Sequence, residues 1–127
     1  MKTLLGFAIA LAAASPAFSQ APQPATVSVT LSNFKFNPAA IEMHAGVPTV
    51  LHLVNTASGG HNFTAPEFFA AAKIAPASQA LVHDGKVEVP KHSALDVTLT
   101  PAAGQYSLKC THMLHSSFGM NGTIVVR

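Results

Sequence analysis

Short runs of alternating apolar and polar residues, separated by turn sequences, constrain the fold of this 127-residue chain most strongly. In the first run, Val27, Val29 and Leu31 alternate with Thr and Ser residues, as expected of a strand with one buried face. The alternation recurs at Ile41/Met43, Leu51/Leu53, Val87/Val89, Leu95/Val97/Leu99 and Tyr106/Leu108/Cys110. Turn dipeptides such as Asp84-Gly85 and Asn121-Gly122 separate the runs. The pattern predicts an all-β antiparallel sandwich or barrel.

Two segments carry different patterns. Residues 66–73 combine an early proline, a glutamate in the first turn and an alanine run, which predicts one short helix. The closing run 123–126 has no alternation, so we expect a strand buried on both faces. Phe34, Phe36 and Phe63 are expected to lie in the core.

The N-terminal residues have the pattern of a secretory signal. Lys2 precedes an apolar run from Leu4 to Ala14, and small residues follow Pro16, with cleavage expected after Ser19. We therefore expect a signal peptide at 1–19, a flexible mature N-terminus at 20–25 and one domain at 26–127. The expected location is the periplasm, and no other run is long enough to span a membrane.

The charge balance excludes several classes of partner. Without Lys2, six basic residues face five acidic ones, a net charge of +1. No basic stripe for nucleic acid and no polybasic membrane patch is present in the sequence. The acidic residues form no close pair, and no nucleophile motif, phosphate-binding glycine loop or Cys-x-x-Cys pair occurs, so we do not expect an enzyme.

The single cysteine lies in a segment typical of a metal site. Cys110 is followed by His115 and then by Met120. A thiolate, imidazoles and a thioether are ligands that copper prefers, and two His, one Cys and a weak axial Met form a blue-copper electron-transfer site. The second histidine must come from elsewhere. The best candidate is His61, in Gly59-Gly60-His61-Asn62.

Two residues of the same segment compete with these ligands. His112 is separated from Cys110 by one residue, which leaves little chain to turn its imidazole toward a shared metal. Met113 competes with Met120 as the axial ligand, although Met120 directly precedes the closing strand. The remaining histidines have no comparable context and are expected to be solvated: His44, His52, His83 and His92.

The segments Gly104-Gln-Tyr-Ser-Leu-Lys-Cys110 and Met120-Asn-Gly-Thr-Ile-Val-Val126 resemble the last two strands and ligand loop of the cupredoxins. Gly60-His61-Asn62 resembles their upstream histidine motif, and the loop spacing is most similar to that of rusticyanin. The resemblance implies a Greek-key sandwich with one copper held by His61, Cys110, His115 and Met120. It also implies a hydrogen bond from Asn62 to the Thr111 segment that holds two ligands together.

The expected function is therefore electron transfer by an exported monomer with one copper ion. Redox partner proteins are expected to dock on an apolar patch near the copper that includes Leu114 and Phe118. The alternative is a periplasmic copper-binding or resistance protein that buffers or delivers copper, which the extra His112 and Met113 favour. The number of tightly bound copper ions distinguishes the two.

Overall fold

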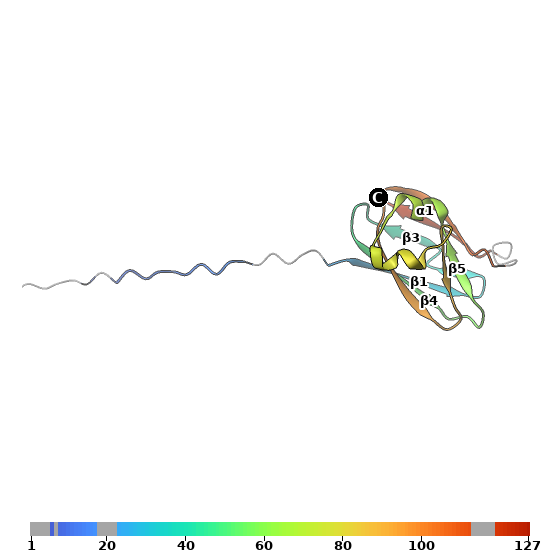
Figure 1. Cartoon of the computed structure of the whole chain (residues 1–127), viewed down its shortest axis with the longest axis horizontal. Coiled ribbons are helices and arrows are strands. Elements are labelled where there is room, and N and C mark those ends of the chain that lie inside the picture. The colour runs from blue at the N-terminus through green and yellow to red at the C-terminus, as the bar shows by residue number, and fades with distance from the viewer. Residues whose placement is uncertain (1–5, 7, 18–22, 113–118) are drawn as a thin grey trace, which may run out of the picture.

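The chain folds into a sandwich of two five-stranded β-sheets (Figure 1), which a computed structural model describes over residues 6, 8–17, 23–112 and 119–127. In spatial order, one sheet contains β2 (Lys35–Asn37), β1 (Ala25–Ser32), β4 (Thr49–Asn55), β8 (Ala94–Thr100) and β6 (Lys73–Ile74). The other contains β3 (Ala40–Met43), β10 (Asn121–Val126), β9 (Gly104–Lys109), β5 (His61–Thr64) and β7 (Lys86–Val89). The predicted all-β sandwich is confirmed.

Most strand pairs are antiparallel, but β1 runs parallel to β4 and β3 runs parallel to β10. The parallel pairs arise because the chain passes from one sheet to the other between β2 and β3 and returns before β4. Such crossings between the sheets are a feature of Greek-key sandwiches. They also bring β5 next to β9, where the candidate ligands lie.

The core lies between the sheets and follows the alternation of the sequence. Leu51, Leu53, Val97 and Leu99 are buried, while the residues between them are half-buried or exposed. Phe63 is fully buried and packs edge-on against Phe36 and Phe69, with ring centroids 6.0 and 5.9 Å apart. The expectation for Phe63 is thus confirmed, and its packing fixes strand β5 in the core.

The predicted helix forms, but it is shorter than the sequence pattern suggested. Helix α1 covers Pro66–Ala71, with Pro66 in its first turn and the aromatic rings of Phe68 and Phe69 buried. Lys73 already belongs to strand β6, which pairs with β8. A 3-10 helix at Pro76–Leu81 follows, which the sequence did not predict. No helix among the described residues is long and apolar enough to cross a membrane.

Two expectations about burial were wrong. Strand β10 is not buried on both faces: Ile124 and Val126 are buried, whereas Thr123 and Val125 are half-buried. Phe34 is not a core residue, because it lies in the turn between β1 and β2 with a φ of 57° and is 43% exposed. Phe36, two residues later on β2, is buried as expected.

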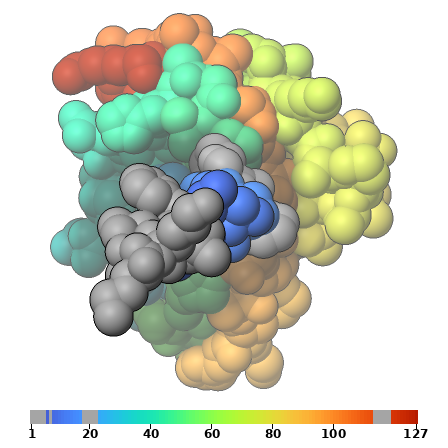
Figure 2. Space-filling view, turned by 90° about the vertical axis from the view of Figure 1, so that its left-hand side faces the viewer, coloured from blue at the N-terminus to red at the C-terminus, as the bar shows by residue number. Residues whose placement is uncertain are grey.

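The start of β1 and the C-terminus lie at one end of the sandwich, and the described candidate ligands lie at the other. At one end, Ala45 donates a backbone hydrogen bond to Arg127, and residues 8–17 extend away from the sheets (Figure 1). Figure 2 looks onto this end, with the N-terminal segment in blue and the C-terminal residues in red. At the other end β9 finishes and β10 begins, since Lys109 pairs with Asn121.

We expect Gly85→Ala to lower the free energy of unfolding by about 3 kcal/mol. Gly85 has a φ of +71°, and a Cβ atom there would lie 2.6 Å from Pro66 Cα at the start of α1. Positive φ costs a non-glycine residue roughly 1–2 kcal/mol, and the clash adds a comparable amount. Gly46→Ala is the matched control, because its φ is +74° with no atom within 4 Å. Urea denaturation measures the loss of unfolding free energy in each variant. Equal losses would show that the clash with Pro66 does not contribute.

Candidate metal centre

Cys110 directly follows the last residue of β9 and continues its alternation. Leu108 and Cys110 are buried, whereas Ser107 and Lys109 are exposed, so the thiol points into the sandwich as predicted. The backbone N–H of Cys110 donates to Met120 O at 3.1 Å, which closes the base of the loop between them. The backbone N–H of Asn62 lies 3.4 Å from Cys110 Sγ. This contact connects the sulfur to the backbone of strand β5.

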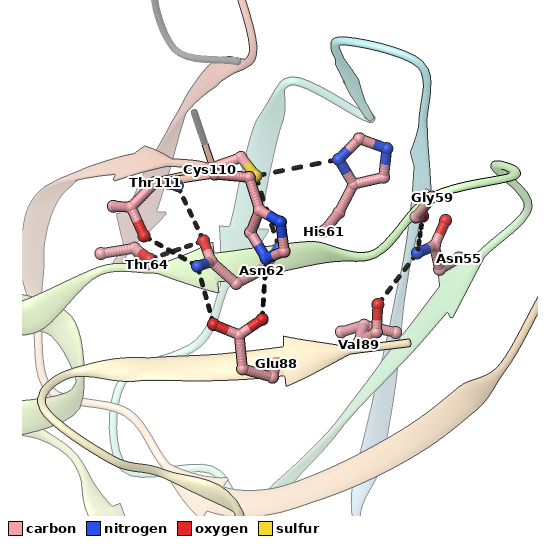
Figure 3. Close-up of polar contacts among 10 residues, drawn as sticks. Asn55, Gly59, His61, Asn62, Thr64, Glu88, Val89, Cys110 and Thr111 are labelled. Atoms are coloured by element: carbon pink, nitrogen blue, oxygen red, sulfur yellow. Dashed lines mark hydrogen bonds and ion pairs between the residues drawn. The ribbon is translucent and has the colours of Figure 1, made fainter. Parts of the chain in front are cut away.

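His61 is the first residue of β5 and is 3% exposed. Its Nδ1 atom lies 3.8 Å from Cys110 Sγ, and a dashed line marks this contact in Figure 3. The loop that precedes it is held by Asn55, whose side-chain amide donates to Gly59 O at 3.0 Å and to Val89 O at 2.9 Å. The Asn55 side-chain oxygen accepts from Ala57 N at 2.9 Å. These contacts fix the point at which the chain enters β5.

Met120 is fully buried immediately before β10, at the same end of the sandwich. The fourth predicted ligand, His115, lies outside the described residues, as do Met113, Leu114 and Phe118. Over the described ranges 23–112 and 119–127, no three His, Cys, Asp or Glu side chains form a group that could hold a metal ion. The described part of the candidate centre is therefore Cys110, His61 and Met120.

The separation of Cys110 Sγ and His61 Nδ1 fits a shared metal ion. Zinc is similar in size to copper, and its bonds in proteins are typically about 2.3 Å to sulfur and about 2.0 Å to nitrogen. Two such bonds at tetrahedral or trigonal angles separate the donor atoms by roughly 3.5–3.8 Å. The observed distance is 3.8 Å. The donors are a thiolate, an imidazole and a thioether, the soft and borderline set that suits copper.

The side chain of Asn62 joins β5 to the segment that follows Cys110 (Figure 3). Its Oδ1 accepts from Thr111 N at 2.9 Å and from Thr64 Oγ1 at 2.8 Å. Its Nδ2 donates to Thr111 Oγ1 at 2.7 Å and to Glu88 Oε1 at 3.0 Å. Asn62 is 1% exposed, so each lost partner would leave a largely buried polar group unsatisfied.

His112 contacts Glu88 on the neighbouring strand β7. His112 Nε2 lies 2.8 Å from Glu88 Oε2. Burial alone would raise the pKa of Glu88, but hydrogen bonds from His112 and Asn62 and the charges of His112 and Lys86 outweigh it. The pKa of Glu88 is therefore below its ordinary value. The carboxylate stays charged at neutral pH.

The other histidines lie away from this centre. His44, His83 and His92 are exposed, and Nδ1 of half-buried His52 on β4 lies 2.5 Å from Asp96 Oδ1 on β8. The sequence did not predict the contributions of Asn55 and Glu88. Asn55 was detectable in principle, because it occupies a core-facing position of the β4 alternation. Glu88 faces outward on β7, and only the pairing of β7 with β5 reveals its role.

A family profile described as "Cupredoxin-like domain" matches residues 3–126, almost the whole chain. No match was found among curated proteins.

Several solved structures share the fold. An auracyanin B structure has 26% identity and a TM-score of 0.61, covering 85% of this chain and 93% of its own. Auracyanin A, described as a "blue" copper protein from Chloroflexus aurantiacus, has 20% identity and a TM-score of 0.59, covering 83% of this chain and 100% of its own. A multicopper oxidase from Campylobacter jejuni has 11% identity and a TM-score of 0.62, covering 87% of this chain and 32% of its own. At 20% and 11% identity, the similarity to auracyanin A and to the multicopper oxidase indicates a shared fold and nothing further.

We expect Asn62→Ala to lower the free energy of unfolding of the metal-free protein by about 1–3 kcal/mol. The substitution removes both hydrogen bonds between the Asn62 side chain and Thr111. The backbone N–H of Thr111 then loses its acceptor, Asn62 Oδ1. Thermal or urea denaturation measures the loss. Asn33→Ala, in the exposed turn before β2, is the control and should change stability by less than about 0.5 kcal/mol. Similar losses in the two variants would show that the Asn62 contacts contribute nothing specific.

Proposed function

The chain belongs to the cupredoxin-like family, and from this premise we propose that it is an exported electron-transfer protein with one copper ion. The proposed ligands are His61, Cys110, His115 and Met120. The observation that carries the proposal is the buried pair of Cys110 Sγ and His61 Nδ1, 3.8 Å apart at the end of the sandwich where Met120 is also buried. The similarity to auracyanins, one described as a blue copper protein, supports it.

The protein supplies a dry and rigid set of donors. Cys110, His61 and Met120 are at most 3% exposed, so water has little access to the sulfur. The Asn62 backbone N–H near Cys110 Sγ tunes the electron density on the thiolate. Because Cys110 and His61 are attached to paired strands, their positions change little when the charge of the site changes.

Copper bound to this set would supply a one-electron couple between Cu(I) and Cu(II). Four protein ligands leave no open position for a substrate, so we propose a carrier and not an enzyme. The multicopper oxidase neighbour does not alter this view, because 11% identity reflects the fold alone.

We propose that a redox partner docks at the end of the sandwich that carries the ligands. Leu114 and Phe118, the residues of the predicted apolar patch, belong to the loop between Cys110 and Met120. The base of this loop lies at this end. Residues 8–17 and the C-terminus lie at the opposite end, so they leave the docking face open (Figure 1). We also propose that residues 1–19 are a signal peptide, that the protein acts in the periplasm and that it is a monomer.

Copper buffering is the alternative, and it would use His112 and Met113 to bind further copper ions. His112 Nε2 is 2.8 Å from Glu88 Oε2, so copper binding through this ring nitrogen would have to displace the contact with Glu88. Met113 lies outside the described residues.

Titration with Cu(II) should show a single tight site. We expect saturation at one equivalent, with an intense thiolate-to-copper charge-transfer band that disappears when ascorbate is added. Visible absorption and EPR spectra measure both effects. A colourless Cu(II) adduct, or two equally tight copper ions, would contradict the electron-transfer proposal, and the second result would favour buffering.

Substitutions should separate the ligands from their neighbours in the loop. We expect Cys110→Ala and His115→Ala to abolish the charge-transfer band, because each removes a strong ligand. His112→Ala and Met113→Ala are the matched controls of the same residue types and should retain the band. If His112→Ala bleaches the protein while His115→Ala does not, the proposed ligand set is wrong.

A further inference from the structure

We propose that Glu88 is a positioning residue that holds the first residues of the ligand loop, Thr111 and His112, against strand β5. Its effect on copper rests on the proposed function, whereas the positioning itself is a property of the metal-free chain. The proposal depends on the two carboxylate oxygens of Glu88, which contact two different segments (Figure 3).

Glu88 lies where these segments meet. It is on β7, the edge strand next to β5, and stands directly opposite Asn62 in the antiparallel register. Oε1 accepts from Asn62 Nδ2 at 3.0 Å, and Oε2 lies 2.8 Å from His112 Nε2. One side chain therefore connects β7 to β5 and to the start of the loop.

The hydrogen bond that Glu88 accepts from Asn62 sets the orientation of the Asn62 side-chain amide. With the amide as observed, Oδ1 accepts the backbone N–H of Thr111 and Nδ2 faces the Glu88 carboxylate. A flipped amide would set an NH₂ group against the Thr111 N–H and an oxygen against a carboxylate, two repulsive contacts. Glu88 thus favours the single orientation in which Asn62 can accept from Thr111, the residue after the proposed ligand Cys110.

The contact with His112 adds a second attachment. The His112 ring lies over Gly60, where an added Cβ would be 3.4 Å from His112 Cε1, and its centroid is 6.4 Å from that of His61. The His112 side chain is 35% exposed, whereas His61 is 3% exposed. By holding His112 in place, Glu88 keeps this half-buried ring beside the proposed ligand His61.

The two contacts as observed require two acceptor oxygens at position 88. A carboxylate offers acceptor oxygens to Asn62 and His112 at once, and hydrogen bonds to a charged group are stronger than neutral ones. A glutamine in the same place would offer one oxygen and one NH₂ group, so it would keep both contacts only if His112 Nε2 became the acceptor, and both would be neutral. Glu88→Gln should therefore weaken the positioning, and Glu88→Ala should remove it.

The first test uses the metal-free full-length protein and amide hydrogen exchange. We expect exchange of the Thr111 N–H to quicken by roughly tenfold or more in Glu88→Ala, and by less in Glu88→Gln. The amides of strand β4 should keep their wild-type rates, which separates local positioning from global destabilisation. Glu42→Gln is the matched control, because Glu42 is an exposed glutamate on β3, the opposite edge of the same sheet.

The second test uses the copper-loaded protein and the rate at which a Cu(I) chelator removes the metal. We expect roughly tenfold faster removal in Glu88→Ala and no change in Glu42→Gln, with the charge-transfer band retained in both. Wild-type protein that takes up no copper would overturn the proposed function, and the exchange measurement would still decide the role of Glu88. Unchanged exchange at Thr111 in Glu88→Ala, or equal acceleration throughout β4, would overturn the inference.

Discussion

The side-chain amide of Asn62 is the contact on which the arrangement of this end of the sandwich depends. It is almost completely buried and has partners on three segments: Thr64 on its own strand, Glu88 on β7 and Thr111 after β9. A buried amide is costly when its partners are missing, so the three segments are held in one relative position. The backbone N–H of the same residue approaches Cys110 Sγ. Asn62 thereby contacts both the neighbouring segments and the sulfur of Cys110.

Period-two alternation was sufficient to predict an antiparallel sandwich or barrel, because one face of each long strand packs on the core. The resemblance to cupredoxins then favoured the sandwich. The same signal could not reveal β5, where four consecutive residues, His61–Thr64, are all buried. Strand β6 has only two residues and forms because β8 offers it partners. Phe34 and Phe36 show the limit of composition, since equally apolar residues separated by one position differ in burial when the first lies in a turn.

For the candidate site, the sequence was informative about donors and less so about their supports. Cys110 and Met120 were identified from their chemistry and their spacing around His115, and His61 from its Gly-Gly-His-Asn context; all three are buried at the same end. Asn55 and Glu88 are ordinary residue types whose contacts form only when β4, β5 and β7 come together. Residues that act through long-range pairing leave no local pattern, so their roles become apparent only from the strand register.

The hydrogen bond from Cys110 N to Met120 O holds the two ends of the loop together independently of the residues within the loop. The ladder of β9 and β10 sets the spacing of the two residues at its base, whatever the length of chain between them. Doubling a flexible loop costs only about 0.6 kcal/mol in closure entropy. Loop segments of other lengths could thus be grafted between Cys110 and Met120 while the sandwich keeps its frame, so that metal geometry and partner preference become exchangeable parts of one scaffold.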